Sequence, residues 1–209
     1  AGRVVTVDKF ASRRDDAKQR LIYEALLEQF DEEQRLRVEG AVDLAYEFPA
    51  RRTQWVPQPA GIPLGFWRSV GSSINTFVVE SMIDELADEA GKDPFEFRRN
   101  MLLHNERLLR LFDKLDAMSA WRKTLPAGRA WGMAYSRAFN THVAQVAEVS
   151  SPSAGTIMVH RVACAVDCGR AVNPGQIEAQ MQGSVLHGMS AALWGKGRKD
   201  FAHYLQSRS

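Results

Sequence analysis

The spacing of hydrophobic positions changes along the chain, from a helical repeat in its middle third to short strand-like runs further on. Between residues 72 and 91, apolar side chains recur every three or four positions, which predicts a helix capped by Ser72 or Ser73. Asp93 and Pro94 are the residue types that begin a further helix, with an acid three positions after the cap. Another short helix is expected over residues 106–118.

A break at residues 126–128 separates these helices from a strand-rich segment. Short, partly β-branched runs predict strands at residues 131–135, 143–149 and 157–166. Residues 150–155 are rich in turn-forming types and are interpreted as the hairpin loop between the last two strands. Asn173 and Pro174 then predict the start of a helix whose apolar stripe continues to Leu193.

That last helix contains two glycines in its interior, Gly183 and Gly188. Each glycine costs a helix about 1 kcal/mol relative to alanine. We therefore expect a packing or ligand-related reason for them, such as a molecule that approaches the backbone closely.

The first forty residues are dense in charge and contain one amphipathic stretch, residues 16–37. This stretch predicts a helix, which either packs on its own domain or binds a partner. Prolines interrupt residues 40–65 and favour a loop-like segment with short extended pieces.

The composition excludes several classes of function. The chain has 209 residues, of which 45% are hydrophobic and 25% charged, and a net charge of +2. This charge is too small to argue for nucleic acid as a partner, and no apolar run is long enough for a membrane span. The five histidines lack metal-ligand spacing, and Cys164 and Cys168 are interpreted as packed thiols rather than a disulfide.

Two positions could bear chemistry on the residues alone. Asp167 follows an apolar strand, where either a ligand site or a turn-forming aspartate is common. Arg68 lies in a glycine-rich loop, where its guanidinium could meet a phosphate or pterin oxygen or could stack on Trp67.

Several blocks in the same order resemble one family, the large subunits of molybdenum hydroxylases (aldehyde oxidase and xanthine dehydrogenase family), most closely the isoquinoline 1-oxidoreductase β-subunit type. They cover about residues 40–195 and read GFWRSVGSSIN (65–75), VESMIDELA (79–87), GKDPFEFRR (91–99), VAQVAEV (143–149), VHRV (159–162), VDCGRAVNP (166–174), AQMQG (179–183) and GMSAAL (188–193).

The resemblance implies an α+β fold, part of a molybdopterin-binding domain with helices packed on short mixed or antiparallel strands. It implies a molybdenum–molybdopterin cytosine dinucleotide and the hydroxylation of an aldehyde or an N-heterocyclic aromatic with oxygen from water. It also implies two protein partners, a small subunit with 2Fe–2S clusters and the remainder of the large subunit.

Site residues follow from the same resemblance. Arg68, Gln180 and Gly183 match positions that contact the cofactor. The substrate pocket would include neighbours of Arg68, namely Phe66, Trp67, Ser69 and Val70. We expect the loop at Arg68 and the helix after Pro174 to approach each other and line one pterin cleft.

The departures define an alternative. The catalytic glutamate motif of the family has no counterpart here, so no catalytic or metal-ligating residue is assigned. Gln182 replaces a glutamate of the family pattern, and His142 stands where a small or aromatic residue is expected. Two segments match the family pattern poorly. Residues 1–39 are interpreted as a helical segment, and residues 196–209 as an atypical tail. The chain is therefore either part of a catalytic subunit or a non-catalytic remnant or assembly protein without molybdenum, in the cytoplasm or the periplasm.

Overall fold

The computed structural model describes residues 5–6, 38–53, 61, 65, 68–121, 123–153 and 156–194. The helix predicted at residues 16–37 and the tail at 196–209 lie outside this range, as do Phe66 and Trp67. A two-residue antiparallel ladder joins β1 (Val5–Thr6) to β2 (Arg52–Thr53).

The three helices predicted for the middle of the chain are confirmed as α3 (Ser72–Glu89), α4 (Pro94–Asn100) and α5 (Glu106–Ser119). The predicted serine cap of α3 is wrong, because the N-cap residue is Gly71 and no side chain caps this helix. Ser72 is already the first helical residue and is buried, and the Ser73 hydroxyl instead donates to the Arg68 carbonyl at 2.8 Å.

The predicted cap of α4 is confirmed in detail. The Asp93 carboxylate accepts hydrogen bonds from the backbone N–H groups of Phe95 at 2.9 Å and Glu96 at 3.0 Å. Pro94 occupies the first helical position, where no N–H group is needed. Two of the orphan donors at this helix end are thereby satisfied.

The three predicted strands form one antiparallel meander of β3 (Arg129–Ala138), β4 (Thr141–Ser153) and β5 (Thr156–Asp167), with β4 in the centre. Phe139 and Asn140 both have positive φ angles, as a two-residue type I′ hairpin requires. The predicted loop at residues 150–155 is too long, because β4 and β5 remain paired as far as Ser153 and Thr156.

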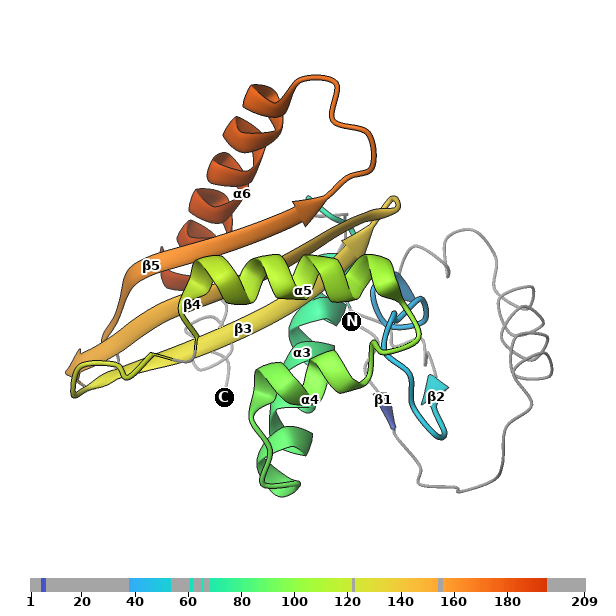
Figure 1. The fold of residues 1–209 in the computed structure, drawn as a ribbon, viewed down its shortest axis with the longest axis horizontal. Coiled ribbons are helices and arrows are strands. Elements are labelled where there is room, and N and C mark those ends of the chain that lie inside the picture. The colour runs from blue at the N-terminus through green and yellow to red at the C-terminus, as the bar shows by residue number, and fades with distance from the viewer. Residues whose placement is uncertain are drawn as a thin grey trace.

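The last predicted helix is confirmed as α6 (Pro174–Trp194). Figure 1 shows α5 lying across the sheet and α6 projecting from the side of β5. Helix α3 contacts β3, α5 contacts β4 and β5, and α6 contacts β5. The α+β class is therefore confirmed. The largest buried apolar side chains of the core are Ile83, Phe95, Leu102, Leu108, Phe112, Leu115 and Val146.

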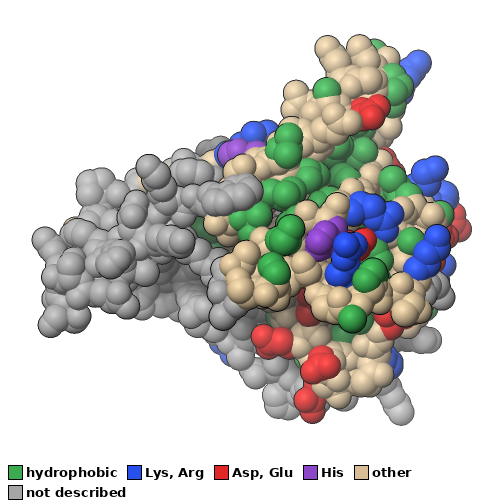
Figure 2. Space-filling view, turned by 90° about the vertical axis from the view of Figure 1, so that its left-hand side faces the viewer, with side chains coloured by type: hydrophobic (Ala, Val, Ile, Leu, Met, Phe, Trp, Pro, Cys, Tyr) green, Lys and Arg blue, Asp and Glu red, His purple; other side chains and the backbone are tan. Residues whose placement is uncertain are grey.

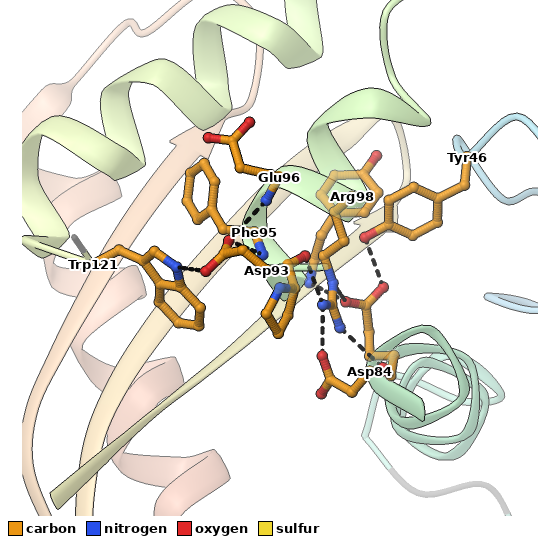
Figure 3. A network of polar contacts seen from close by, with 10 residues as sticks. Tyr46, Asp84, Asp93, Phe95, Glu96, Arg98 and Trp121 are labelled. Carbon is orange, nitrogen blue, oxygen red and sulfur yellow. Dashed lines mark hydrogen bonds and ion pairs between the residues drawn. The ribbon is translucent and has the colours of Figure 1, made fainter. Parts of the chain in front are cut away.

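A buried ion pair joins α3, α4 and the sheet (Figure 3). The fully buried Arg98 donates to the Glu80 carboxylate at 2.9 Å and to Asp84 at 2.6 Å. Glu80 also accepts from the Tyr46 hydroxyl and from the backbone N–H of Tyr135, each at 2.9 Å. Burial raises the pKa of Glu80, and the Arg98 guanidinium opposes that shift. The network holds four separate segments of the chain together.

Candidate cofactor-binding surface

The start of α6 is fixed by its own cap and by the turn that leads into it. The Asn173 side chain accepts from the backbone N–H of Gln176 at 3.2 Å, which confirms the predicted cap. The preceding loop contains Gly169 with a φ of +80°, a conformation that glycine adopts readily. The helix that carries Gln180 and Gly183 therefore begins at a defined place beside the end of β5.

Helix α6 is far more exposed than the other helices. Of its predicted apolar stripe, Ile177, Met181 and Val185 are only half-buried, and Leu186 is 64% exposed. None of the described side chains of α6 is buried. The apolar stripe exists as predicted, but the described part of the chain covers it incompletely.

Gln180 and Gly183 lie on the side of α6 that faces away from the sheet. Successive helical residues are turned by about 100°, which places these two residues opposite Val185 and Met189, whose side chains face β5. Gln180 and Gly183 are both exposed. The Gln180 amide forms no hydrogen bond to any residue that the structure describes, so its donors and acceptor are available to a ligand.

Both helical glycines also have free space beside them. A Cβ atom added at Gly183 or Gly188 would meet no other part of the structure within 4 Å. The packing reason expected for these glycines is thus not supplied within this structure. An open glycine next to an exposed amide is a surface on which a flat ligand can lie against the backbone.

Two clefts open between α6 and the body of the molecule, on the opposite side of α6 from Gln180. One has a volume of about 600 Å³ and lies between α5, the end of β5 and the start of α6. The other has a volume of about 690 Å³ and lies between β5 and the second half of α6. Figure 2 shows hydrophobic side chains gathered below the projecting α6.

The loop before α3 holds the second group of predicted site residues. Ser69 and Val70 both have positive φ angles, +68° and +49°. The Ser69 and Ser73 hydroxyls lie 2.7 Å apart. Each hydroxyl can donate a hydrogen bond to the Arg68 carbonyl, at 2.6 Å from Ser69 and 2.8 Å from Ser73. Arg68 and Ser69 are exposed, and the Arg68 side chain makes no hydrogen bond within the described part of the chain.

The two groups of predicted site residues are attached to opposite edges of the sheet. The loop at Arg68 leads into α3, which contacts β3, whereas Gln180 and Gly183 belong to α6, which contacts β5. Arg68, Ser69 and Val70 do not line either cleft beside α6. That both groups line one pterin cleft therefore stays a prediction.

Asp167 has the turn-forming role that was one of the two alternatives for this position. Its carboxylate accepts from the Gly169 N–H at 2.9 Å and from Arg107 at 2.7 and 2.8 Å. The Arg107 guanidinium, helped by the Gly169 N–H, holds the pKa of this carboxyl well below its usual range. The bidentate pair ties α5 to the end of β5. No local pattern signals this pair, because its partners are sixty positions apart.

His142 is explained by its neighbour. Its buried ring stacks on Tyr135, with ring centroids 6.1 Å apart, and Nδ1 lies 2.7 Å from the Tyr135 hydroxyl. Burial, with the nearby charges of Arg107 and Arg137, lowers the pKa of His142. A histidine at this position thus serves as an aromatic core residue with one polar contact.

The remaining candidates are also placed. Cys164 is half-buried and Cys168 is exposed, and both are free thiols, so the prediction of packed thiols fits Cys164 and is wrong for Cys168. Among the described residues, no three histidine, cysteine or acidic side chains are grouped so as to hold a metal ion. No helix in that part of the chain is long and apolar enough to cross a membrane.

Comparison with known proteins identifies the domain. The molybdopterin cofactor-binding domain family matches residues 77–200, a range that includes α4 to α6, most of α3 and the whole sheet β3-β4-β5. The chain belongs to this family. The matched range also contains Gln180 and Gly183.

Three curated proteins are similar to the chain. The chain is 33% identical over 154 residues to the beta subunit of isoquinoline 1-oxidoreductase from Brevundimonas diminuta. The aligned region covers 72% of this chain and 20% of that protein. It is 32% identical over 144 residues to a nicotinate dehydrogenase subunit from Pseudomonas putida, and this region covers 60% of the chain and 12% of that subunit. It is 30% identical over 154 residues to the membrane-bound aldehyde dehydrogenase (pyrroloquinoline-quinone) of Gluconacetobacter polyoxogenes, and this region covers 62% of the chain and 19% of that protein.

The predicted resemblance to molybdenum hydroxylase large subunits is therefore confirmed. The chain spans a fifth or less of the length of these relatives. A molybdenum–pterin cofactor is the ligand that this family of domains binds.

Proposed function

We propose that this chain is the part of a molybdenum hydroxylase large subunit that supplies one wall of the cofactor site, and that the outward side of α6 is that wall. The observation that carries the proposal is the pairing of an exposed, uncommitted Gln180 with an open helical Gly183. In an isolated helix, an interior glycine is unfavourable and an exposed glutamine is neutral. Beside a planar ring with polar edges, the glycine lets the ring approach the backbone and the glutamine amide can hydrogen-bond to the ring edge.

The residues fit such a ligand by their chemistry. The Gln180 amide offers two donors and one acceptor, which suits the mixed donors and acceptors of a pterin. Gly183 removes the side chain that would otherwise keep a ring system off the backbone. Arg68 would contribute a guanidinium to a phosphate or pterin oxygen, with Phe66, Trp67, Ser69 and Val70 nearby as the substrate side of the site.

The finer identity of the site is part of the same proposal. The cofactor would be the cytosine dinucleotide form, and when bound it would supply the redox chemistry that hydroxylates a carbon atom with oxygen from water. The protein residues would bind and orient it. The names of two relatives refer to isoquinoline and nicotinate, which favours an N-heterocyclic aromatic as the substrate, with an aldehyde as the other class.

The partners in this proposal are the remainder of the large subunit and a small subunit with 2Fe–2S clusters that receives the electrons. Two of the relatives are named as subunits, which supports an assembly of more than one chain. This chain has no residue to which the catalytic base is assigned, so we expect no turnover by the chain alone.

Cofactor content tests the proposal without relying on activity. The full 209-residue chain is produced in a host that makes the molybdenum cofactor. Molybdenum is then measured by mass spectrometry, and the pterin by fluorescence after oxidation. We expect molybdenum and pterin in equal amounts, and release of a cytosine nucleotide on acid hydrolysis. Folded protein without molybdenum or pterin would contradict the proposal and favour the non-catalytic remnant or assembly protein.

A matched pair of variants locates the site on α6. Gly183→Val puts a branched side chain on the outward side, whereas Gly188→Val makes the same change on another side of the same helix, with the same change in helix propensity. We expect the first variant to lose most of its bound pterin and the second to keep it. Equal loss in both variants would mean that only helix stability matters and that Gly183 makes no ligand contact.

A further inference from the structure

The direction of α6 is weakly determined by its packing. Among the described helices and strands, α6 contacts mainly β5, and none of its described side chains is buried. The residues that lead into it, 168–173, are all exposed. Figure 1 shows this connection leaving the end of β5 and α6 projecting from the side of the sheet. A contact at the start of α6 therefore has a large influence on where the helix points.

Asp167, at the end of β5, supplies such a contact. Its Oδ1 accepts hydrogen bonds from the Gly169 N–H at 2.9 Å and from Arg107 Nη2 at 2.8 Å. Its Oδ2 accepts from Arg107 Nε at 2.7 Å. A bidentate arginine–carboxylate pair fixes orientation as well as distance. Asp167 thus couples the turn that leads toward α6 to the position of α5.

Helix α5 is a firm support for this pair. Leu108 is fully buried, and its N–H donates to the capping side chain of Asn105 at 3.2 Å. Arg107 Nη2 also lies 3.4 Å from the carbonyl oxygens of Asn140 and Asp167. One guanidinium therefore joins α5, the β3–β4 hairpin and the end of β5, and it relates the start of α6 to the core.

The exposure of the pair argues against a role in stability alone. The side chains of Arg107 and Asp167 are 31% and 30% exposed. Ion pairs that water reaches add little to stability, because solvent screens them. The two-point geometry is nevertheless specific. What the pair provides is direction for the chain that leaves β5.

Gln180 and Gly183 lie far enough along α6 to be sensitive to that direction. With a rise of 1.5 Å per residue, they lie about 9 Å and about 13 Å along the helix from Pro174. A tilt of about 20° at its start would move Gly183 by about 5 Å. Binding groups have to be held within about 0.5 Å of their productive positions.

We infer that Arg107 and Asp167 are positioning residues, whose bidentate pair sets the direction of α6 and thereby places Gln180 and Gly183. The pair lines the cleft at the start of α6, on the opposite side of that helix from Gln180, so it acts through the helix and not by touching the ligand. The inference rests on the proposed function for its ligand, whereas the direction of α6 can be measured without one.

The angle between α6 and the sheet is the first test. Residual dipolar couplings of the backbone amides report it in the isotope-labelled 209-residue chain. Asp167→Asn keeps an acceptor for the Gly169 N–H but loses the charge that holds Arg107. We expect it to change or average the couplings of α6 while those of β3, β4 and β5 stay as in the parent. Arg107→Lys keeps the charge without the two-point geometry and should show a smaller change.

Arg110→Ala is the matched control. Arg110 lies one turn further along α5, lines the same cleft and forms an exposed ion pair with Glu106 at 3.5 Å. Its removal should leave the couplings of α6 unchanged. Asp167→Asn combined with Arg107→Lys should change them no more than Asp167→Asn alone, because both substitutions break the same contact.

Pterin content is the second test. In chains produced in a host that makes the molybdenum cofactor, Asp167→Asn should hold about tenfold less pterin per folded chain, as is typical when a supporting hydrogen bond is removed. Arg107→Lys should retain an intermediate amount, and Arg110→Ala as much as the parent. The urea midpoints of all three variants should stay close to that of the parent, which separates positioning from stability.

Three results would overturn the inference. They are unchanged α6 couplings in Asp167→Asn, an equal change in Arg110→Ala, and a displaced α6 that still holds as much pterin as the parent. A loss of pterin that only follows the urea midpoints would assign the pair to stability alone. If the parent chain holds no pterin, the proposed function fails, while the couplings still decide whether the pair directs α6.

Discussion

The two ends of the described domain differ in how far they are stabilised by their own residues. Helices α3, α4 and α5 bury large side chains in the core, and α3 and α4 share the buried Glu80–Arg98 pair. Helix α6 packs mainly on β5 and has no buried side chain among its described residues. Yet α6 is more apolar on average than α5. Hydrophobic composition therefore does not by itself distinguish a core helix from one that binds an external partner.

What distinguishes them is how far the described part of the chain covers their apolar side chains. The apolar positions of α5 meet β4 and β5, while those of α6 border open clefts. An apolar stripe that is only partly covered is typical of an interaction surface. Perturbations should therefore have large effects on stability in the first region and small ones in the second.

The largest effect is expected from Arg98→Ala. It leaves the Glu80 carboxylate buried without its partner, which destabilises proteins by about 3–5 kcal/mol. Arg170→Ala, an exposed arginine just before α6, should change stability by less than about 0.5 kcal/mol. Urea unfolding followed by circular dichroism measures both. If Arg98→Ala does not fold, the milder Glu80→Gln supplies the value. A loss below about 1 kcal/mol in Glu80→Gln, or a midpoint for Arg98→Ala like that of the parent, would contradict a structural role for the network.

A second comparison uses one substitution in both regions. Leu115 on α5 is fully buried and Leu186 on α6 is 64% exposed. Leu115→Ala should destabilise the chain by about 2–5 kcal/mol through the cavity it leaves, and Leu186→Ala by less than about 0.5 kcal/mol. Thermal unfolding measures the contrast. Similar losses for the two variants would mean that α6 is integral to the folding unit.

The third prediction concerns the helical glycines and has the opposite sign. Gly183→Ala and Gly188→Ala fill open space on α6 and should each stabilise the helix by about 0.5–1 kcal/mol. Hydrogen exchange of the α6 amides reports this locally. Faster exchange in either variant would show that a neighbour not seen in this structure packs against that position.

The smallest effect is a dependence of stability on pH. Because the pKa of His142 is lowered in the folded state, the unfolded chain binds more protons, and stability falls as the pH drops from about 7 to about 5, through the ordinary pKa of histidine. His142→Phe keeps an aromatic ring on Tyr135 and should remove this slope. Urea midpoints across the pH range test it, and an equal slope in both proteins would assign the effect to other groups.

Local signals made most of the fold predictable. Asp93 and Pro94 marked the start of α4, and short β-branched runs located all three strands. Long-range polar pairs were missed, since nothing near Arg98 or Arg107 in the sequence indicates the carboxylates at Glu80 and Asp167. The serine cap failed for a related reason, because the Ser73 hydroxyl is used outside the helix.

Among the candidate site residues, Gln180 was singled out only through the resemblance. Arg68 and the interior glycine Gly183 were also singled out on the residues alone, as a guanidinium in a glycine-rich loop and as a glycine inside an apolar helix. Arg68 and Gln180 belong to elements on opposite edges of the sheet. Sequence order does not show which edge of the sheet each element packs on, because that depends on the tertiary packing of α3 on β3 and of α6 on β5.

The loop between Arg68 and α3 has a consequence of its own. Val70 is β-branched and yet adopts a left-handed backbone conformation, which is unfavourable for this residue type. The hydrogen bonds of the Ser69 and Ser73 hydroxyls and the helix that follows hold the loop in this shape. A molecule that docks there would lose little affinity to ordering the backbone, and its rate of capture would depend on encounter rather than on rearrangement.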